Sequence, residues 1–231
     1  MGRLKREPHS VESMTSHLLK IVRKQEVWNP VSLRSHPELI GWAGIDLPGR
    51  VGGGSWPAQQ MAVLFRDCGR IDLELRDLIG GGHARLLTLV STRRFDGLLL
   101  KVTSGSSYCG IAITEPETGP DMQSLSTSAN PISDGYRLEG AKQCISRLEE
   151  ASHFLVFAVV RRPAPQPLIS AFLVPRSAAG FEWEQVETMG LSTVSWGRVR
   201  LRDVLVPSSC RVGGRARAYL FSFVTRAIGA P

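Results

Sequence analysis

The sequence predicts an α+β fold, in which an amino-terminal α-helical domain is followed by a β-sandwich or barrel and then by a short terminal helix. Apolar residues recur at helical spacing through about the first hundred residues, and this period is typical of amphipathic helices. From about residue 108 the period changes to two, and short β-branched and aromatic runs alternate with Gly, Pro, Asp and Ser, as in sandwiches and barrels. The predicted regions are a helical domain at 1–107, a β-domain at 108–210 and a helical tail at 211–231.

Four groups of apolar residues carry the helical pattern of the first region. They are Val11, Met14, Leu18, Ile21 and Val22; Met61, Leu64, Phe65 and Cys68; Leu75, Leu78 and Ile79; and Ala84, Leu86, Leu87, Leu89 and Val90. Ser55 and Pro57 precede the second group and suit the start of a helix. Between the first two groups, an apolar face at residues 39–43 runs up to the glycine-rich breaker GIDLPGRVGGG.

The β region contains six predicted strands separated by turn residues. They lie at residues 109–114, 124–129, 136–139, 154–160, 169–174 and 199–206. The dipeptide Asp134-Gly135 predicts a hairpin turn between two of them. After these strands the tail from Ala218 to Ile228 returns to helical spacing, and an apolar helix at a chain end needs a surface to pack against.

Composition and charge restrict the class of protein. With 231 residues, 42% of them hydrophobic, the chain can bury a substantial core. The net charge, 28 − 21 = +7, suits an anionic partner such as a nucleotide, a phosphopantetheine carrier, an acidic protein surface or nucleic acid, and a solvated basic face fits it equally. The amino-terminal segment has no apolar core for a signal peptide, and no apolar run reaches membrane-spanning length. We therefore expect a soluble cytoplasmic protein with no membrane partner.

Several motifs can be set aside. The cysteines are spread singly, at Cys68, Cys109, Cys144 and Cys210, so we expect neither a metal site nor a disulfide framework. The glycine clusters at 52–54 and 80–82 lack the third glycine of GxGxxG and the Gly-Lys-Ser/Thr of a phosphate-binding loop. His83 has no acidic residue or nucleophile at a diagnostic interval. Arg215 and Arg217 form only a short basic cluster, so nucleic acid is not an expected partner.

Four blocks of the β region carry the strongest signal. They are TEPETGPD at 114–121, DGYRLEGAKQCIS at 134–146, ISAFLVP at 169–175 and MGLSTVSWGRVRLRDVLVP at 189–207. In this order and spacing they resemble the middle β-domain of the acyl-CoA dehydrogenase family. Upstream, ELIGWAGIDLPGRVGGG at 38–54 is similar to a loop region of that family's amino-terminal helical domain. The resemblance implies a flavin oxidoreductase that binds FAD and desaturates an acyl thioester.

The resemblance also implies positions for a flavin and substrate site. Ile113 and Thr114, at the end of an apolar strand, would line and hydrogen-bond the flavin, and Gly119 would let the backbone approach the cofactor or the substrate. Ser146 stands where the family places a threonine whose hydroxyl meets the flavin ring. Cys144 stands where the family places a tryptophan that packs against the flavin. Ordinary turn and strand chemistry is the alternative interpretation of Thr114 and Ser146.

Three departures from the family pattern bear on that site. Pro120, at a substrate position, replaces a serine and removes both a hydroxyl and a backbone N–H. The small side chain of Cys144 leaves space beside the flavin, or admits a different substrate or partner group. Before the last predicted strand, Val194-Ser195-Trp196 replaces the family's Ser-x-Thr, and Trp196 is a candidate to fill space elsewhere.

The chain resembles only the start of the carboxy-terminal helical bundle, which in the family supplies the glutamate base and much of the FAD contact. No catalytic base is expected in this chain. Glu115 and Glu117 lie in the flavin-facing turn, on the wrong side of a substrate for that role.

Three hypotheses follow from the resemblance. The first is one subunit of a split acyl-CoA or acyl-carrier-protein dehydrogenase, a hetero-oligomer in which a second polypeptide supplies the helical bundle, its base and much of the FAD site. The second is a repurposed fold with a non-redox role, such as shaping a cyclisation or binding an acyl carrier. The third is a non-catalytic subunit that stabilises a complete dehydrogenase through the terminal helix. We prefer the first.

Overall fold

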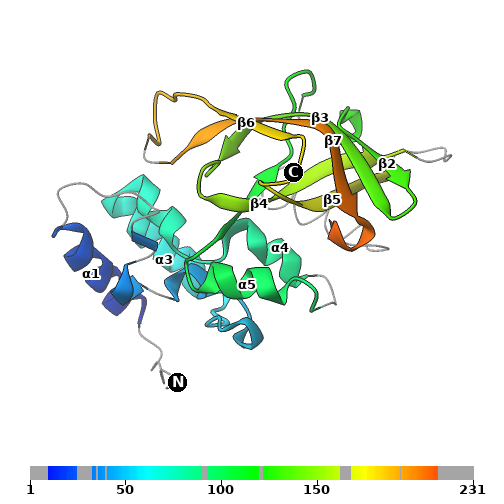
Figure 1. Ribbon diagram of the computed structural model, residues 1–231. Coiled ribbons are helices and arrows are strands. Elements are labelled where there is room, and N and C mark those ends of the chain that lie inside the picture. The colour runs from blue at the N-terminus through cyan, green and yellow to red at the C-terminus, as the bar shows by residue number, and fades with distance from the viewer. Residues whose placement is uncertain are drawn as a thin grey trace. The chain divides into compact units, whose positions relative to one another are not determined.

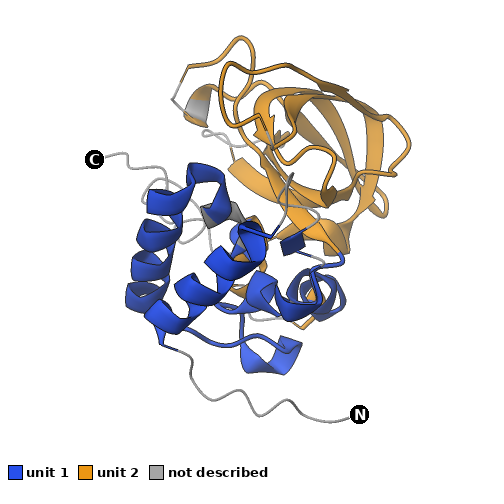
Figure 2. Cartoon of the chain, turned by 90° about the vertical axis from the view of Figure 1, so that its left-hand side faces the viewer, with its two compact units in different colours: residues 1–82, 96–106 blue, residues 83–95, 107–231 orange. Residues whose placement is uncertain are grey.

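The computed structural model describes residues 10–24, 33–34, 36–39, 41–89, 93–119, 122–161, 168–192 and 194–212. The chain divides into two compact units, residues 1–82 with 96–106 and residues 83–95 with 107–231 (Figure 2). One unit is helical and the other holds the whole sheet, so the predicted α+β class is confirmed. Within the described ranges, no helix has the length and apolar character needed to cross a bilayer. The predicted terminal helix lies outside the described residues.

Among the described residues, the helical unit has the following bounded helices and 3-10 turns. They are α1 (Val11–Val22), η1 (Pro37–Leu39), η2 (Trp42–Gly44), η3 (Gly49–Val51), α3 (Ala58–Ile71), η4 (Leu73–Leu78) and α5 (Asp96–Thr103). The Ser10 side chain accepts a hydrogen bond from the Ser13 backbone N–H at 3.2 Å and caps α1. Pro57 precedes α3 as predicted, because its fixed φ suits a helix start.

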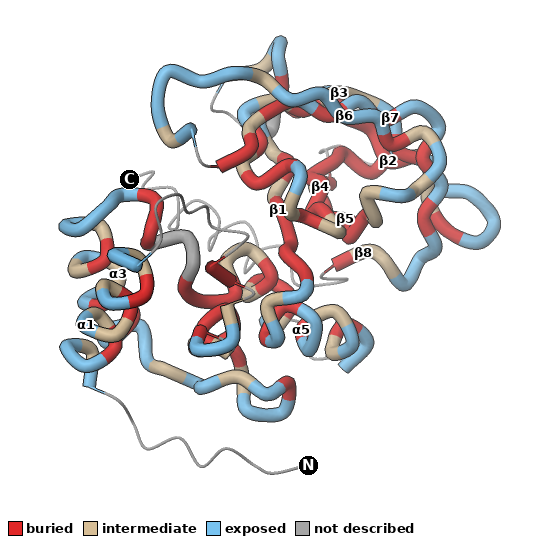
Figure 3. The backbone as a smooth tube through the Cα atoms, turned by 60° about the vertical axis from the view of Figure 1, so that its left-hand side comes forward, coloured by how far each residue is buried: buried red, intermediate tan, exposed pale blue. Residues whose placement is uncertain are grey.

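The buried stripes of α1 and α3 belong to one hydrophobic core. In Figure 3 buried and exposed positions alternate along both helices. The buried members are Met14, Leu18 and Ile21 of α1 and Met61, Leu64 and Cys68 of α3, with Trp42 and Leu75 beside them. Leu39 and the pair Trp42 and Ala43, which continue the apolar pattern, lie in separate 3-10 turns rather than in one long helix, because Gly41 adopts a left-handed φ of 88° before the second turn.

The second unit contains α4 (Arg85–Thr88) and an eight-stranded sheet; η5 (Gly82–Ala84) lies at its boundary. The strands are β1 (Tyr108–Ala112), β2 (Ser128–Ile132), β3 (Gly135–Ser146), β4 (Ala151–Val160), β5 (Leu168–Pro175), β6 (Phe181–Gln185), β7 (Trp196–Pro207) and β8 (Arg211–Val212), with 3-10 turns η6 (Met122–Ser124) and η7 (Ser208–Cys210). Their order is β6-β7-β3-β2-β4-β5-β8, and β1 pairs with β4 (Figure 1). Side chains from seven of these strands meet in one hydrophobic core.

The strand β4 occupies the centre of this sheet. It pairs with β5 along its whole length on one side, and on the other side with β1 and then β2, both parallel to it. From Phe154 to Val160 every residue of β4 is buried, as expected for a strand covered on both faces. Because β1 and β2 follow one another along the same edge of β4, the chain between them, residues 113–127, leaves the sheet and returns to it.

Several strand boundaries differ from the sequence-based prediction for identifiable reasons. β3 was predicted to end at Glu139 but continues to Ser146, because Gly140 takes a φ of 147° within a bulged strand. β6 was not predicted, because only Phe181 of its five side chains is buried. The predicted strand at 124–129 begins at Ser128 instead, since backbone groups before it bind a buried carboxylate. The hairpin turn occupies Ser133 and Asp134, one residue earlier than predicted.

Candidate functional site

The candidate site is built around the loop that leaves the sheet between β1 and β2. The pairing of β1 with β4 ends at Ala112, opposite Val156, and the pairing of β2 begins at Ser128, opposite Val159. The sequence-predicted residues Ile113, Thr114 and Gly119 all lie in this loop. Its position therefore depends on contacts other than sheet hydrogen bonds.

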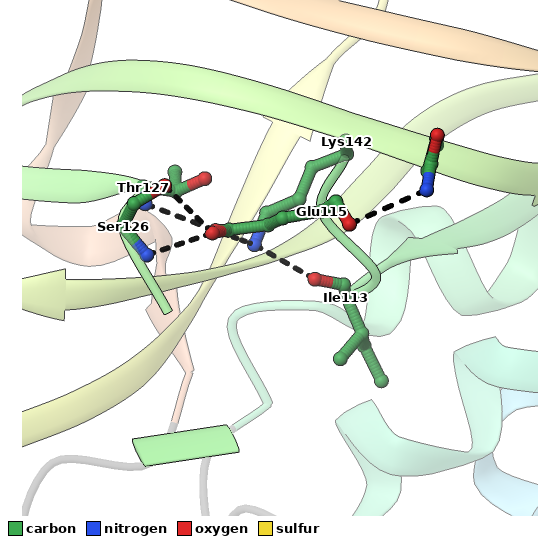
Figure 4. A network of polar contacts seen from close by, with 6 residues as sticks. Ile113, Glu115, Ser126, Thr127 and Lys142 are labelled. Atoms are coloured by element: carbon green, nitrogen blue, oxygen red, sulfur yellow. Dashed lines mark hydrogen bonds and ion pairs between the residues drawn. The ribbon is translucent and has the colours of Figure 1, made fainter. Parts of the chain in front are cut away.

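A buried ion pair holds the start of this loop (Figure 4). Lys142 of β3 places its Nζ 2.8 Å from Glu115 Oε1 and donates to the Ile113 carbonyl at 2.9 Å. The side chains are 0% and 1% exposed. The Glu115 carboxylate also accepts hydrogen bonds from the Ser126 and Thr127 backbone N–H groups at 2.7 and 2.9 Å, and from the Ser126 hydroxyl at 2.7 Å. One carboxylate thus joins the beginning of the loop, its end and β3.

Both members of the pair have displaced pKa values. Burial alone would raise the pKa of the Glu115 carboxyl, but the hydrogen bonds from Lys142, Thr127 and Ser126 outweigh it and lower the pKa to about 2. Burial lowers the pKa of the Lys142 ammonium to about 8, and Glu115 opposes part of that shift. Glu115 is therefore a fixed carboxylate with no access to solvent.

Gln143 connects this loop to the end of β3. Its backbone N–H donates to the Thr114 carbonyl at 2.8 Å, and its side-chain amide donates to the Glu115 carbonyl at 3.3 Å. The structure thereby brings Thr114 beside Gln143 and the adjacent Cys144, although 29 positions separate Thr114 and Gln143 in the sequence. The two predicted segments, around Thr114 and around Cys144, therefore form one surface.

A β-bulge shapes the second of these segments. The β3–β7 register shifts between Lys142 and Ile145, and Cys144 within the shift has a left-handed φ of 54°. Lys142 and Ile145 are both buried, whereas Cys144 is exposed and Ser146 is half-buried. The extra residue turns Cys144 outward, as bulges do when they redirect a side chain.

The hydroxyl groups of this surface are available to a ligand. Thr114 is exposed and Ser146 half-buried, and within the described part of the chain neither hydroxyl has a hydrogen-bond partner. Across from Ser146 in the register lies Trp196, whose buried Nε1 has no partner among those residues either. One hydroxyl on the anchored loop and one at the end of β3, with an aromatic ring across from the second, can hydrogen-bond the polar edge of a ligand.

The other predicted site residues are Ile113, Gly119 and Pro120. Ile113 is half-buried, and its carbonyl is taken up by Lys142. Gly119 is exposed, and a Cβ added there would meet nothing within 4 Å, so the packing of this chain does not itself require glycine at that position. Pro120 lies outside the described residues.

Sequence reasoning missed Lys142, although it fixes the whole loop. The signal was present, because a lysine at a buried position of a strand must find a counter-charge. The strand itself was predicted to end before it, so the position was not recognised as buried.

Comparisons with known proteins agree with this fold. Residues 110–204 match the family "Acyl-CoA dehydrogenase, middle domain". Acyl-CoA dehydrogenase FadE12 of Mycobacterium bovis is 26% identical over 199 residues, which cover 79% of this chain and 49% of that protein. Residues 110–204 therefore form an acyl-CoA dehydrogenase middle domain, as the motifs predict, and the relatives that match most of the chain are acyl-CoA dehydrogenases.

Two solved structures share the fold. A glutaryl-CoA dehydrogenase from Mycobacterium smegmatis in complex with FADH2 has a TM-score of 0.77 at 17% identity, covering 91% of this chain and 58% of that chain. The ChsE4–ChsE5 complex of Mycobacterium tuberculosis has a TM-score of 0.76 at 22% identity, covering 97% and 62%. The chain therefore spans about half the length of FadE12 and about three fifths of the matched structures.

Proposed function

We propose that this chain is one subunit of a split, FAD-dependent dehydrogenase that desaturates an acyl thioester carried by coenzyme A or by an acyl carrier protein. In this assembly a second polypeptide supplies a helical bundle, the catalytic base and much of the FAD site. The observation that carries the proposal is the surface of Thr114, Cys144 and Ser146, which the Glu115–Lys142 pair and Gln143 fix in place. A neighbour in fold is itself a complex, ChsE4–ChsE5, and another holds FADH2.

The residues of this chain would bind and orient rather than transfer protons. The hydroxyls of Thr114 and Ser146 would donate to the flavin edge, and because they stand on a clamped loop and a strand they lose little freedom on binding. The bound FAD supplies the hydride acceptor. Since the Glu115 carboxylate is buried and ion-paired, the proton acceptor would come from the partner.

Co-expression tests the proposal. The chain should be purified alone and together with the product of a neighbouring reading frame, and each preparation examined for flavin colour and for desaturation of acyl thioesters. Colour and activity are expected only in the joint preparation. A colourless and inactive mixture that nevertheless forms a complex would contradict the proposal.

One observation favours a second candidate, a non-redox role for the same fold. At Cys144 an exposed thiol on a left-handed residue occupies the position of the family's flavin-packing tryptophan. The cysteine side chain is smaller than tryptophan, so it leaves room for a bulkier acyl or carrier group and makes less contact with a flavin. Activity of the complex in protein freed of flavin would support this candidate over the first.

A further inference from the structure

A pocket of about 460 Å³ opens on the outer face of β3, β6 and β7, a volume typical of small-molecule sites. Its lining residues are Pro116, Ala141, Lys142, Gln143, Glu182, Trp183, Glu184, Arg198, Val199 and Arg200. None of the residues assigned above to flavin or substrate lies in this lining. The pocket can therefore hold either a separate ligand or another part of the ligand that the candidate site binds.

Two arginines of β7 line this pocket together with two acidic residues of β6. Arg198 and Arg200 are exposed, whereas the residues before, between and after them, Gly197, Val199 and Leu201, are buried. Because successive side chains of a strand point to opposite faces, both arginines project from the same outer face with Cα atoms roughly 7 Å apart. Two guanidinium groups at that spacing can converge on a single anionic group.

The charges around these arginines are only partly compensated. Arg202, the next outward arginine, is ion-paired with Glu182 at 3.3 Å, and Lys142 is paired with Glu115. In the described ranges, neither Arg198 nor Arg200 has a carboxylate oxygen within 4.0 Å. Guanidinium groups without a close counter-charge can bind an anion from outside the chain.

The acidic residues of β6 limit which kind of anion the pocket can bind. Glu182 faces Arg200 across the β6–β7 register and is ion-paired with Arg202, and Glu184 faces Arg198. The Glu184 carboxylate therefore offsets one of the two positive charges that remain. A carboxylate ligand, with one negative charge, would gain little net attraction. A phosphate ester carries up to two negative charges and matches the forked geometry of guanidinium. We propose that this pocket binds a phosphate or diphosphate ester through Arg198 and Arg200.

The pocket adjoins the candidate site through two residues. Gln143 lines it and hydrogen-bonds the Thr114 and Glu115 carbonyls, while Pro116 lies on the same clamped loop. A phosphate held here would anchor a ligand whose other end reaches the surface of Thr114 and Cys144. That this ligand is coenzyme A, the phosphopantetheine arm of a carrier protein or the diphosphate of FAD rests on the proposed function; the preference of the pocket for phosphate does not.

Binding to the full chain, purified alone and free of flavin, tests the proposal. Inorganic diphosphate is titrated calorimetrically at fixed ionic strength into the wild type and into Arg198→Gln, Arg200→Gln and Arg137→Gln. Each of the first two substitutions is expected to weaken binding about tenfold, the loss of one charge-assisted hydrogen-bonded pair. Arg137→Gln is the matched control, because Arg137 is an exposed arginine of the neighbouring strand β3 that is ion-paired with Asp203 and absent from the pocket lining, and its loss should change the affinity less than about twofold. Glu184→Gln should tighten binding, because it removes the opposing charge.

The sources of the phosphate are distinguished by a second series. Coenzyme A, pantetheine 4′-phosphate, ADP and unphosphorylated pantetheine are titrated in turn, and the tightest phosphate-bearing compound identifies the physiological source. Equal weakening by all three arginine variants would show a general cationic surface and overturn the proposal. Equal affinity for pantetheine and its phosphate, or no heat with diphosphate, would also overturn it. These titrations contain neither flavin nor partner. If the pocket fails to bind phosphate, the proposed dehydrogenase function is not contradicted. If the dehydrogenase function is disproved, the phosphate titrations still test the pocket.

Discussion

Lys142 Nζ lies 2.8 Å from Glu115 Oε1, and both side chains are buried, so a single ion pair anchors the loop after β1 to the neighbouring strand β3. Replacement of one partner leaves the other as an unpaired buried charge. We expect Glu115→Gln to lower the free energy of unfolding by about 3–5 kcal/mol, measured by urea denaturation. Glu117→Gln, an exposed substitution in the same loop, is the control and should change it by less than about 0.5 kcal/mol.

A double substitution distinguishes the ion pair from simple loss of packing. In Glu115→Gln combined with Lys142→Met no charge remains buried, and much of the lost stability should return. If the double variant loses as much free energy of unfolding as the two single variants together, the two side chains act independently. That result would contradict the anchoring of the loop by this ion pair.

The same pair predicts an acid-sensitive component of stability. The pKa of Glu115 is lowered from its usual 4.5 to about 2, so the ionised form stabilises the fold above pH 4.5, and this contribution is lost as the pH falls from about 4.5 towards 2. The loss from this one group is on the order of 3 kcal/mol. Urea unfolding at a series of pH values should show it in the wild type. The doubly substituted protein should lack this component, and an identical pH dependence in both would contradict the assignment.

The bulge at Cys144 predicts a stabilising substitution. A non-glycine residue at a φ of 54° costs roughly 1–2 kcal/mol relative to glycine, and the Cys144 side chain is exposed and contributes little packing. Cys144→Gly should therefore raise the melting temperature or leave it unchanged. Cys210→Gly should lower it, because Cys210 packs partly against the sheet core and has no left-handed φ. A clear loss of stability in Cys144→Gly would contradict the outward orientation of the thiol.

Thiol labelling tests whether this surface is covered in the complex. Burial raises the pKa of the Cys68 and Cys109 thiols to about 12 and also raises that of Cys210, whereas Cys144 is exposed. One fast labelling phase is therefore expected in the isolated chain, and Cys144→Ala should abolish it. Flavin and partner together should slow this phase strongly. Undiminished labelling in an active, flavin-loaded complex would show that Cys144 is not part of the covered wall.

The sequence predicted the elements whose burial follows a regular period. Met14, Leu18 and Ile21 of α1 and the run Phe154–Val160 of β4 are buried as their patterns indicate. The prediction failed in elements whose buried positions do not follow a regular period. β6 carries exposed side chains at four of its five positions, and α5 was not predicted.

The candidate site was predictable only in part. Motif resemblance proposed Thr114, Cys144 and Ser146 for the site, and the structure places these residues on two adjoining segments. It did not identify Lys142 or Gln143, because their roles come from the approach of β3 to a loop 29 positions earlier. No local pattern reports such a contact, and the bulge that exposes Cys144 is likewise a property of the paired strands.

The flavin content of the purified complex tests the central claim most directly. The wild-type chain and the Thr114→Val/Ser146→Ala variant are each co-purified with the partner, and the ratio of bound flavin to protein is read from the visible absorption spectrum. The account predicts no flavin on the isolated chain, flavin in the wild-type complex, and markedly less in the variant complex of the same stability. An isolated chain that binds flavin and desaturates a thioester unaided, or a variant complex with undiminished flavin, would contradict it.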